Sequence, residues 1–253
     1  MFQEQRLNKL LQLLEKNEEL SSKDMIDYFK VSRDTIRRDF LILTKEGKVK
    51  RTHGGIMKVS QKPQIYSFEE RLSKFSDAKT HIAKNAETFI KDNGTYFLDV
   101  STTVLKLAQL IDKKATIYSH SLDNAIMLSN KQNIKFNLLG GQFFKKNRFY
   151  YSLNEAEVLK NISFDVAFIG AAGLRNGEIS FEDQEDAFLK QLVLQNAKTK
   201  ILVAEETKFN QSATYTIGTI NDFDYFITDK ALKREKANLL SNDVSLIYRE
   251  KKG

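Results

Sequence analysis

Apolar residues recur at helical spacing in three stretches of the first sixty residues. In the first two stretches the apolar positions are Leu7, Leu10, Leu11 and Leu14, and then Met25, Ile26 and Phe29. A repeat of three or four residues places such side chains on one face of a helix, so both stretches are predicted to be amphipathic helices. Ser21 or Ser22 suits the cap of the second, because a serine hydroxyl accepts a hydrogen bond from a first-turn amide.

The third helix is expected to begin at Ser32, with Asp34 as the other candidate for its cap. Its expected apolar positions are Ile36, Phe40, Leu41 and Leu43. Gly47 is expected to end it, and residues 48–59 then alternate weakly around Gly54-Gly55, which suits a two-stranded hairpin. Three helices and a hairpin predict a winged helix-turn-helix domain in residues 1–60.

The pattern changes in the rest of the chain. A stretch around the single proline, Pro63, has no clear period, so residues 61–75 are interpreted as a linker. In residues 76–253, short β-rich runs alternate with amphipathic stretches such as 102–111 and 184–197. The β-rich runs are 95–100, 116–121, 135–141, 164–173, 200–206, 224–229 and 244–248. This alternation predicts a larger α/β domain with a mostly parallel sheet covered by helices.

The positive charge is concentrated near the N-terminus. The chain of 253 residues has a formal net charge of +7, and residues 1–62 hold 14 Lys and Arg against 9 Asp and Glu, a balance of +5. A compact basic segment is typical of a polyanion partner. The chain has no cysteine, the first twenty residues mix charges with apolar residues, and no long apolar run occurs. Disulfides are therefore excluded, no signal peptide or membrane span is expected, and the cytoplasm is the expected location.

The third helix has the features of a DNA-reading element. A recognition helix reads bases from its N-terminal end, where Ser32, Arg33, Thr35 and Arg37 stand, and Arg38 is suited to a phosphate. Further phosphate or minor-groove contacts are expected from Arg51 and His53 of the hairpin, and more weakly from Arg6 and Lys23. The alternative is that the charged run is only a solvated helical face.

A candidate anion site follows the first expected strand of the larger domain. Asp99 ends that strand, and Ser101, Thr102 and Thr103 open a helix whose first-turn amides and dipole suit a phosphate. Ordinary N-capping by Ser101 or Thr102 is the alternative. The glycine turns at 140–141 and 170–173 also end strands, and small residues permit close approach of a ligand, although each is also an ordinary tight loop.

The chain resembles the DeoR family of bacterial transcriptional regulators. The resemblance starts with Arg6, Leu10 and Leu14, and continues through the run VS-x-x-TIRRD at 31–39 and EG-x-x-x-R-x-HGG at 46–55. It implies a repressor of a carbohydrate-utilisation operon that binds double-stranded operator DNA as a homodimer or homotetramer. It also implies control by a phosphorylated sugar.

The sensor part of that family is similar in fold to ribose-5-phosphate isomerase, and its motifs match residues 99–103, 119–121, 170–173, 185–190 and 204–208. The resemblance implies that Ser101, Thr102, Thr103 and Lys208 bind phosphate, and that Asp99, Glu185 and Lys190 lie near the sugar. Ser121 and Gly170 also lie in the matched motifs, and the glycine turn at Gly140 and Gly141 completes the expected effector residues. For Lys190 the alternative is a surface ion pair with Asp186 at i,i+4.

Several alternatives remain at this point. Lys145, Lys146 and Arg148 of the basic and aromatic segment 143–152 suit a second phosphate of a bisphosphate effector, a solvated loop or a subunit contact. The same segment would suit base stacking in an RNA-binding protein. An isomerase with a DNA-binding appendage is the competing enzyme class, since carboxylates are present for acid–base chemistry. No cofactor is expected, and a metal site has little support because the three histidines are scattered along the chain.

Overall fold

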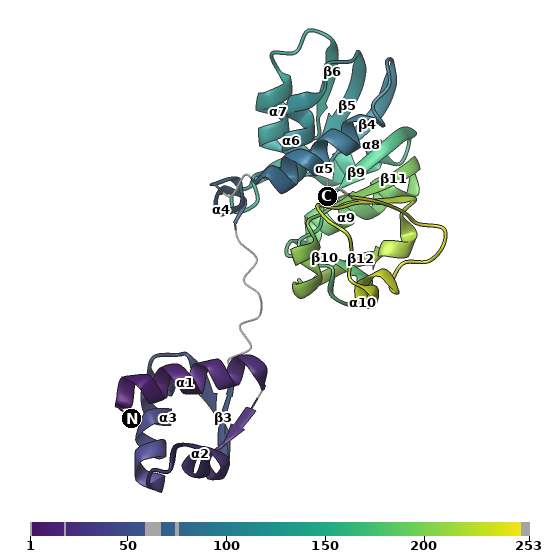
Figure 1. Cartoon of the computed structure of the whole chain (residues 1–253). Coiled ribbons are helices and arrows are strands. Elements are labelled where there is room, and N and C mark those ends of the chain that lie inside the picture. Colours follow the sequence, from purple (N-terminus) through teal and green to yellow (C-terminus); the bar gives the residue numbers. More distant parts are fainter. Residues whose placement is uncertain (1, 18, 59–66, 74–75, 249–253) are drawn as a thin grey trace. The chain divides into compact units, whose positions relative to one another are not determined.

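The chain folds into two compact units, residues 1–62 and residues 63–253. A computed structural model describes residues 2–17, 19–58, 67–73 and 76–248, and Figure 1 traces the elements of both units. The division falls within the expected linker, at residues 62 and 63. Pro63 itself lies outside the described residues.

The described residues of unit 1 form three helices and three short strands. In chain order these are α1 Gln3–Lys16, β1 Glu19–Ser21, α2 Ser22–Phe29, α3 Arg33–Lys45, β2 Val49–Arg51 and β3 Gly55–Lys58. The strands form one antiparallel sheet in the order β1-β3-β2, so the predicted hairpin is present and β1 adds a third strand that the pattern did not predict. Unit 1 therefore has the predicted winged helix-turn-helix architecture.

The predicted caps and apolar positions of unit 1 are largely confirmed. The hydroxyl of Ser21 accepts from the Asp24 amide at 3.0 Å, and that of Ser32 accepts from the Thr35 amide at 3.2 Å. The buried core consists of Leu10, Leu14, Leu20, Met25, Ile36, Phe40, Leu43, Val49 and Ile56. Leu41 is an exception: its side chain is 51% exposed, because the position lies one residue past Phe40 and faces away from the core.

Unit 2 is organised around a seven-stranded sheet in the order β14-β13-β11-β9-β4-β5-β6. Its strands are β4 Gly94–Leu98, β5 Ala115–Ser119, β6 Ile134–Leu138, β9 Phe164–Ile169, β11 Ala197–Val203, β13 Tyr225–Ile227 and β14 Ser245–Ile247. All neighbouring pairs are parallel. Each of the seven predicted β-rich runs therefore contributes one strand, and the predicted parallel sheet is confirmed.

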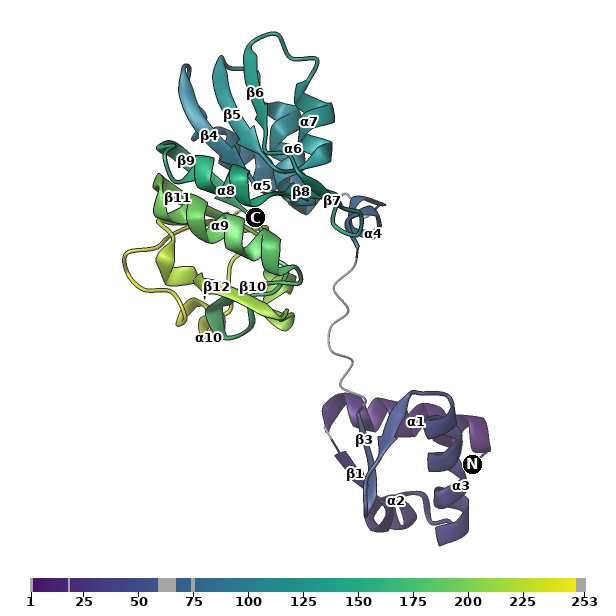
Figure 2. The ribbon, with the colours of Figure 1, turned by 180° about the vertical axis from the view of Figure 1, so that it is seen from behind.

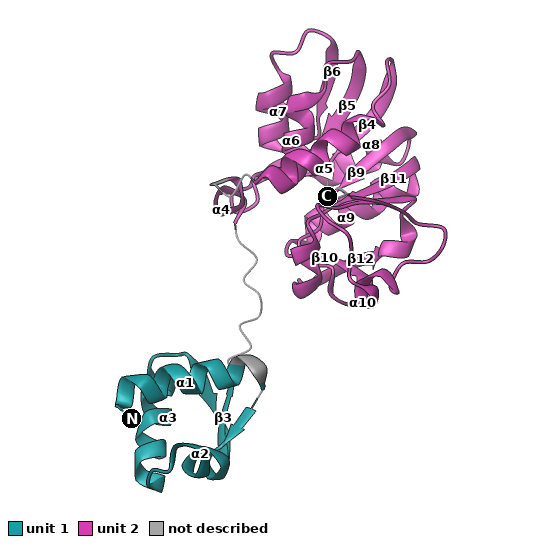
Figure 3. Ribbon diagram, in the orientation of Figure 1, with its two compact units in different colours: residues 1–62 teal, residues 63–253 magenta. Residues whose placement is uncertain are grey.

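Helices cover both faces of this sheet. Figure 1 shows α5 Asp77–Glu87 in front of one face, which it covers with α6 Thr102–Leu110 and α7 Leu122–Leu128. The view from behind in Figure 2 shows α8 Leu153–Leu159 and α9 Gln184–Gln195 in front of the other face. Figure 3 separates this unit from unit 1 by colour.

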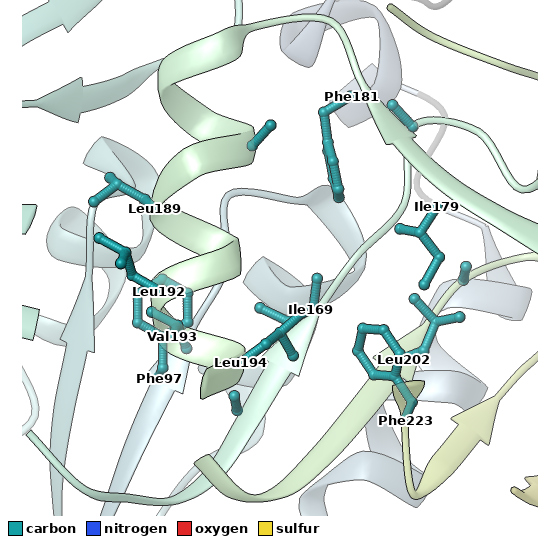
Figure 4. Packing of buried hydrophobic residues seen from close by; sticks show 14 of the residues in the cluster. Phe97, Ile169, Ile179, Phe181, Leu189, Leu192, Val193, Leu194, Leu202 and Phe223 are labelled. Carbon is teal, nitrogen blue, oxygen red and sulfur yellow. The ribbon is translucent and has the colours of Figure 1, made fainter. Parts of the chain in front are cut away.

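The side chains of each strand alternate between two cores. Tyr96, Leu98 and Phe168 pack under α5, α6 and α7. Phe97 and Ile169 point to the opposite face, where Figure 4 shows them among Leu189, Leu192 and Val193 of α9. A strand buried on both faces reads as a continuous apolar run, which explains why the β-rich runs were visible in the sequence.

Smaller elements complete unit 2. Two antiparallel pairs join β7 Gln142–Phe144 to β8 Phe149–Tyr151 and β10 Glu178–Phe181 to β12 Tyr215–Thr219. The remaining helical elements of the described chain are α4 Phe68–Ser73, α10 Arg234–Ala237 and the short 3-10 helices Arg175–Gly177, Glu206–Asn210 and Ile220–Asp222. In none of the helices described here is there an apolar stretch of sufficient length to traverse a bilayer.

The short helix α4 corrects the interpretation of residues 61–75 as a linker. Residues 61–66 and 74–75 lie outside the described part, but residues 68–73 form a helix that packs on unit 2. Phe68 is fully buried beside Val100, Leu105 and Phe149. The helix is only six residues long, too short for a periodic pattern to identify it.

Candidate DNA interface and ligand pocket

Helix α3 presents a row of cationic side chains. Arg33, Arg37 and Arg38 are exposed, while Ile36 and Phe40 of the same helix are buried in the core of unit 1. The cap at Ser32 leaves the first turn of α3 facing solvent, with Thr35 half-buried beside it. This is the arrangement that a recognition helix needs, because its N-terminal residues must reach base edges while its opposite face stays packed.

The hairpin of β2 and β3, called the wing below, adds two more exposed side chains, Arg51 and His53. The Arg51 guanidinium lies 5.6 Å from the centre of the Phe40 ring, so the wing strand is packed against α3. Gly55 begins β3, the middle strand of the sheet, and a Cβ atom there would lie 1.9 Å from the Leu20 carbonyl oxygen of the edge strand β1. Any side chain at position 55 would therefore separate β3 from β1. Lys23, on α2, is also exposed.

Arg6 has a different environment from the one expected for a phosphate contact. Its side chain is buried, and its Nε and Nη2 atoms donate to the carboxylate of Asp39 at 2.8 and 3.3 Å. Asp39 is fully buried within α3 and also accepts from Gln3 at 3.2 Å. The pair fastens α1 to α3. Arg6 thus supports the recognition helix from behind, which corrects its assignment as a DNA contact.

In unit 2, the order of the strands creates a switch point. The chain leaves β4 toward β5 and β6 on one side, and β9, β11, β13 and β14 follow on the other. In open parallel sheets a crevice forms at such a point, beyond the carboxyl ends of the strands. Asp99 follows β4 and Gly170 follows β9, and the Gly170 amide donates to the Asp99 carboxylate at 2.8 Å.

A cavity of about 290 Å³ opens at this switch point. The hydroxyl-bearing residues Ser101, Thr102 and Thr103 line it at the start of α6. Among the described residues, the cations that line it are Arg71, Lys79 and Lys208, and the carboxylate is that of Glu205. The sequence-based prediction of a phosphate site named four of these residues, Ser101, Thr102, Thr103 and Lys208. It missed Arg71 and Lys79.

The predicted cap is present at Ser101, and it is compatible with the predicted anion site. The Ser101 hydroxyl accepts from the Val104 amide at 3.0 Å and so caps α6. The first-turn amides of Thr102 and Thr103 cannot bond within the helix, because no carbonyl precedes them at the required position. The hydroxyl-rich first turn of α6 therefore offers both amides and side chains to an anion.

The cations around this cavity influence one another. Burial lowers the pKa of Lys208 to about 8, with a further lowering from the charges of Arg71 and Lys79 and an opposing contribution from Glu205. The Lys208 ammonium donates to Gln211 at 3.0 Å. Burial also lowers the pKa of Arg71, against the raising effect of nearby carboxylates. A crowded set of partly desolvated cations is stabilised when an anion enters.

A second, smaller cavity of about 20 Å³ adjoins the first. Its charged residues are Arg71, Asp99, Glu182, Asp186 and Lys190. The Lys190 ammonium is 2.6 Å from Asp186 and 3.1 Å from Asp99, and it lies 3.4 Å from the centre of the Phe181 ring. The i,i+4 ion pair with Asp186 that was the alternative is therefore present, but it is buried rather than on the surface, since the Lys190 side chain is 1% exposed.

His120 completes this buried network. Its Nε2 atom is 2.8 Å from the second carboxylate oxygen of Asp186. Burial raises the pKa of Asp186, but Lys190 and His120 together hold it below its ordinary value. Asp99, His120 and Asp186 bring ligand atoms within 4.8 Å of one another, the kind of set that holds a metal ion. The Lys190 ammonium lies between the two carboxylates and already supplies the positive charge.

Five of the expected effector residues lie outside both cavities. Ser121 caps α7, accepting from the Asn124 amide at 3.2 Å, and Gly140 and Gly141 form the turn between β6 and β7. Gly170 packs on Ser101, where an added Cβ would lie 2.7 Å from the serine Cβ. Glu185 is half-buried on α9 and lines neither cavity. Two carboxylates close to it in sequence, Glu182 and Asp186, line the second cavity instead.

The basic and aromatic segment 143–152 is largely engaged within unit 2. Arg148 donates to Asp123 at 2.8 and 3.0 Å, and Lys146 donates to Glu182 at 3.0 Å. Phe144 stacks on the fully buried Phe149, with ring centres 4.6 Å apart. Lys145 is exposed. These contacts leave few groups of the segment for a second phosphate or for nucleic-acid bases.

Comparison with known proteins agrees with this organisation. Residues 6–62 match the model of the DeoR-like helix-turn-helix domain, and residues 74–230 match that of the DeoR C terminal sensor domain. The HTH-type transcriptional repressor GlcR of Bacillus subtilis is 32% identical over 252 residues, with 99% of this chain and 98% of the relative covered.

Two further similarities extend the comparison. The lactose phosphotransferase system repressor of Lactococcus lactis is 29% identical over 252 residues, covering 98% of this chain and 99% of the relative. Ribose 5-phosphate isomerase A from Methanocaldococcus jannaschii shares 16% identity over 52% of this chain and 53% of that one, with a TM-score of 0.39. On the family models and the full-length relatives, the chain belongs to the DeoR family of transcriptional regulators.

Proposed function

We propose that this regulator is a repressor that binds duplex operator DNA through α3 and responds to a phosphorylated sugar in unit 2. The proposed binding of a phosphorylated sugar, called the effector half below, rests on one observation. The cavity at the switch point is lined, among the described residues, by three cations and by three adjacent hydroxyl-bearing residues at the start of α6. Both relatives described above are named repressors, and one of them serves a sugar phosphotransferase system.

The DNA half rests on the exposed face of α3. Arg33 and Arg37 reach base edges in the major groove, and Arg38 contacts a phosphate, with Arg51 and His53 of the wing on the adjacent backbone. A single helix reads only a few base pairs. Two copies of the chain, as a homodimer or within a homotetramer, would place two α3 helices on half-sites about one helical turn apart.

The effector half follows from charge and hydrogen bonding. In the described part of the chain, the charged residues that line the larger cavity are three cations and one carboxylate, so it favours an anion. A phosphate group matches the site because its oxygens accept from the first-turn amides of α6, from the hydroxyls and from Lys208 together. The remaining volume and the adjoining smaller cavity accommodate the rest of a small phosphorylated molecule.

Binding without turnover suits the buried carboxylates better than isomerisation does. A general base needs a carboxylate oxygen that is open to the substrate. Asp99 accepts from the Val100 amide, the Gly170 amide and Lys190, and Asp186 accepts from His120 and Lys190. Asp99 and Asp186 are therefore committed to internal donors, and of the carboxylates that line the smaller cavity in the described part of the chain only Glu182 keeps an open oxygen. The preference for a switch over an enzyme rests on the first two.

The proposal is tested by measuring DNA binding with and without sugar phosphates. The DNA would be the promoters of the gene for this chain and of its neighbours, and the ligands a panel of pentose and hexose monophosphates. At least one ligand is expected to change DNA affinity by tenfold or more, the coupling typical of such switches. A DNA affinity that no ligand in the panel changes, with no ligand binding by calorimetry, would refute the effector half.

A further inference from the structure

The two cavities of unit 2 are adjoining compartments of opposite electrostatic character. They share Arg71, Ser101 and Ala171 in their linings. The larger compartment has Arg71, Lys79 and Lys208 against Glu205, a formal balance of two positive charges. The smaller has Arg71 and Lys190 against Asp99, Glu182 and Asp186, a balance of one negative charge. A ligand that spans both must therefore be anionic at one end only.

Two hydrogen-bonding atoms of the smaller compartment are left without a partner. Within the described part of the chain, neither the buried Nε of Arg71 nor the buried Oε2 of Glu182 has a hydrogen-bond partner. Another atom of each side chain is engaged. Arg71 donates through Nη2 to Asn147 at 3.1 Å, and Glu182 accepts through Oε1 from Lys146 at 3.0 Å. These contacts fix the orientation of both groups, and a buried donor or acceptor left unpaired is costly.

One donor and one acceptor in a cavity of about 20 Å³ match a single chemical group. A cavity of more than about 10–15 Å³ holds a group the size of a water molecule. A hydroxyl both accepts and donates one hydrogen bond, so it satisfies the Arg71 Nε–H and the Glu182 Oε2 at once. A phosphate or carboxylate cannot donate to Glu182, and a methyl group satisfies neither atom.

We infer, resting on the function proposed above, that the smaller compartment recognises a hydroxyl group of the effector between Arg71 and Glu182. The phosphate then occupies the larger compartment, and Arg71 contacts both ends of the same molecule. The effector is thereby a phosphate monoester whose far end is uncharged and hydroxylated. Glu182 and Arg71 are the residues that determine this specificity.

A bisphosphate is expected to bind poorly at this site. Three carboxylates surround the far end of the ligand site, and they would repel a second phosphate. Two of the three cations that suggested a second phosphate are already paired, Lys146 with Glu182 and Arg148 with Asp123. Lys146 therefore acts through Glu182, by holding the acceptor in place.

The experiment compares ligands that differ at the far end. Calorimetry on the full chain would measure the affinities of inorganic phosphate, the best sugar monophosphate of a panel, its singly deoxygenated analogues and the corresponding bisphosphate. One deoxygenated analogue is expected to bind at least tenfold more weakly than the parent, because it leaves a charged donor and acceptor unpaired. The bisphosphate is also expected to bind at least tenfold more weakly.

Two variants identify the responsible residues. Glu182→Gln keeps an oxygen for Lys146 but presents an amide N–H to the compartment, and Arg71→Lys keeps the charge but removes Nε. Both are expected to lower the ratio of sugar-phosphate affinity to inorganic-phosphate affinity by about tenfold. Glu178→Gln is the matched control, since Glu178 is exposed on β10 and lines neither cavity, and it is expected to leave the ratio unchanged.

The outcomes separate the two proposals. If neither inorganic phosphate nor any sugar phosphate binds the wild-type chain, the proposed effector function fails. If sugar monophosphates bind, but every deoxygenated analogue binds equally well and Glu182→Gln leaves the affinity ratio unchanged, the hydroxyl compartment is refuted while the phosphate site stands. Circular dichroism of each variant would establish that it is folded.

Discussion

The guanidinium of Arg71 donates a hydrogen bond to the side chain of Asn147 at 3.1 Å. This contact joins α4, the first described element after residues 59–66, to the turn between β7 and β8. Asn147 in turn donates to Asp183 at 2.6 Å, and the Phe68 amide donates to the Lys146 carbonyl at 3.3 Å. Helix α4 places Arg71 in the lining of both cavities, and the turn that contacts α4 contributes Asn147 to the lining of the smaller cavity alone.

Asn147→Ala is predicted to weaken effector binding without unfolding the protein. The substitution removes the acceptor that orients Arg71 and leaves the guanidinium free to rotate. Affinity for the best sugar monophosphate is expected to fall about fivefold to tenfold, the effect of losing one hydrogen bond. Calorimetry measures it, with Asn161→Ala as a control on an exposed turn remote from the site. Equal affinities of wild type and Asn147→Ala would contradict this arrangement.

Replacing Arg37 and Arg38 together with alanine is predicted to abolish specific DNA binding. Both side chains are exposed on the outer face of α3, and each good base contact contributes about 1–3 kcal/mol of discrimination. Fluorescence anisotropy with operator DNA over a range of salt concentrations would measure the loss and a smaller salt dependence. Lys45→Ala removes an exposed cation from the other end of α3 and serves as the control. Undiminished binding by a folded double variant would exclude α3 as the reader.

Asp39→Ala is predicted to destabilise unit 1 by about 3–5 kcal/mol, because it leaves the buried Arg6 guanidinium without its carboxylate. Hydrogen exchange on the full chain would detect this as faster exchange of α1 and α3 amides, with unit 2 unchanged. The double variant Arg6→Met, Asp39→Leu removes both charges and is expected to recover much of the stability. A single variant as stable as wild type would show that the pair is dispensable.

Effector affinity is predicted to fall as the pH rises above about 8. The Lys208 pKa in the free protein is about 8, and a bound phosphate raises it by favouring the charged ammonium. Binding above pH 8 therefore requires proton uptake, at a limit of about tenfold in affinity for each pH unit. Lys208→Arg remains charged throughout and is expected to remove most of this dependence. Calorimetry between pH 7 and 9.5 tests it, and a flat profile for wild type would contradict the assignment.

The same shift has a consequence for stability with a definite sign. The folded-state pKa of Lys208 lies below its ordinary value of 10.5, so the unfolded chain binds more protons between about pH 8 and 10.5. Burial of the charged Lys208 therefore lowers the free energy of unfolding by its full amount below pH 8. As the pH rises from 8 to 10.5, this destabilisation disappears and the free energy of unfolding increases. A bound phosphate monoester is expected to offset the same cost at neutral pH.

Periodicity alone identified most of the fold. The seven β-rich runs were recognisable because parallel strands buried on both faces, such as β4 with Tyr96 and Phe97 on opposite sides, are nearly continuous in apolar residues. The caps at Ser21 and Ser32 were recognisable because capping is a local interaction over three residues. Leu41 was misplaced because helical spacing does not define how wide the buried face is.

The sequence by itself determined the winged helix-turn-helix, the parallel α/β unit and the hydroxyl-rich turn at residues 101–103, since each depends on neighbours close along the chain. Only the tertiary structure decided that Arg6 is buried against Asp39, that Arg71 and Lys79 line the larger cavity, and that Glu182 rather than Glu185 lines the smaller one. These residues are far apart in sequence. Their charges and hydrogen bonds meet only once the strand order has brought the carboxyl ends of β4, β9 and β11 together.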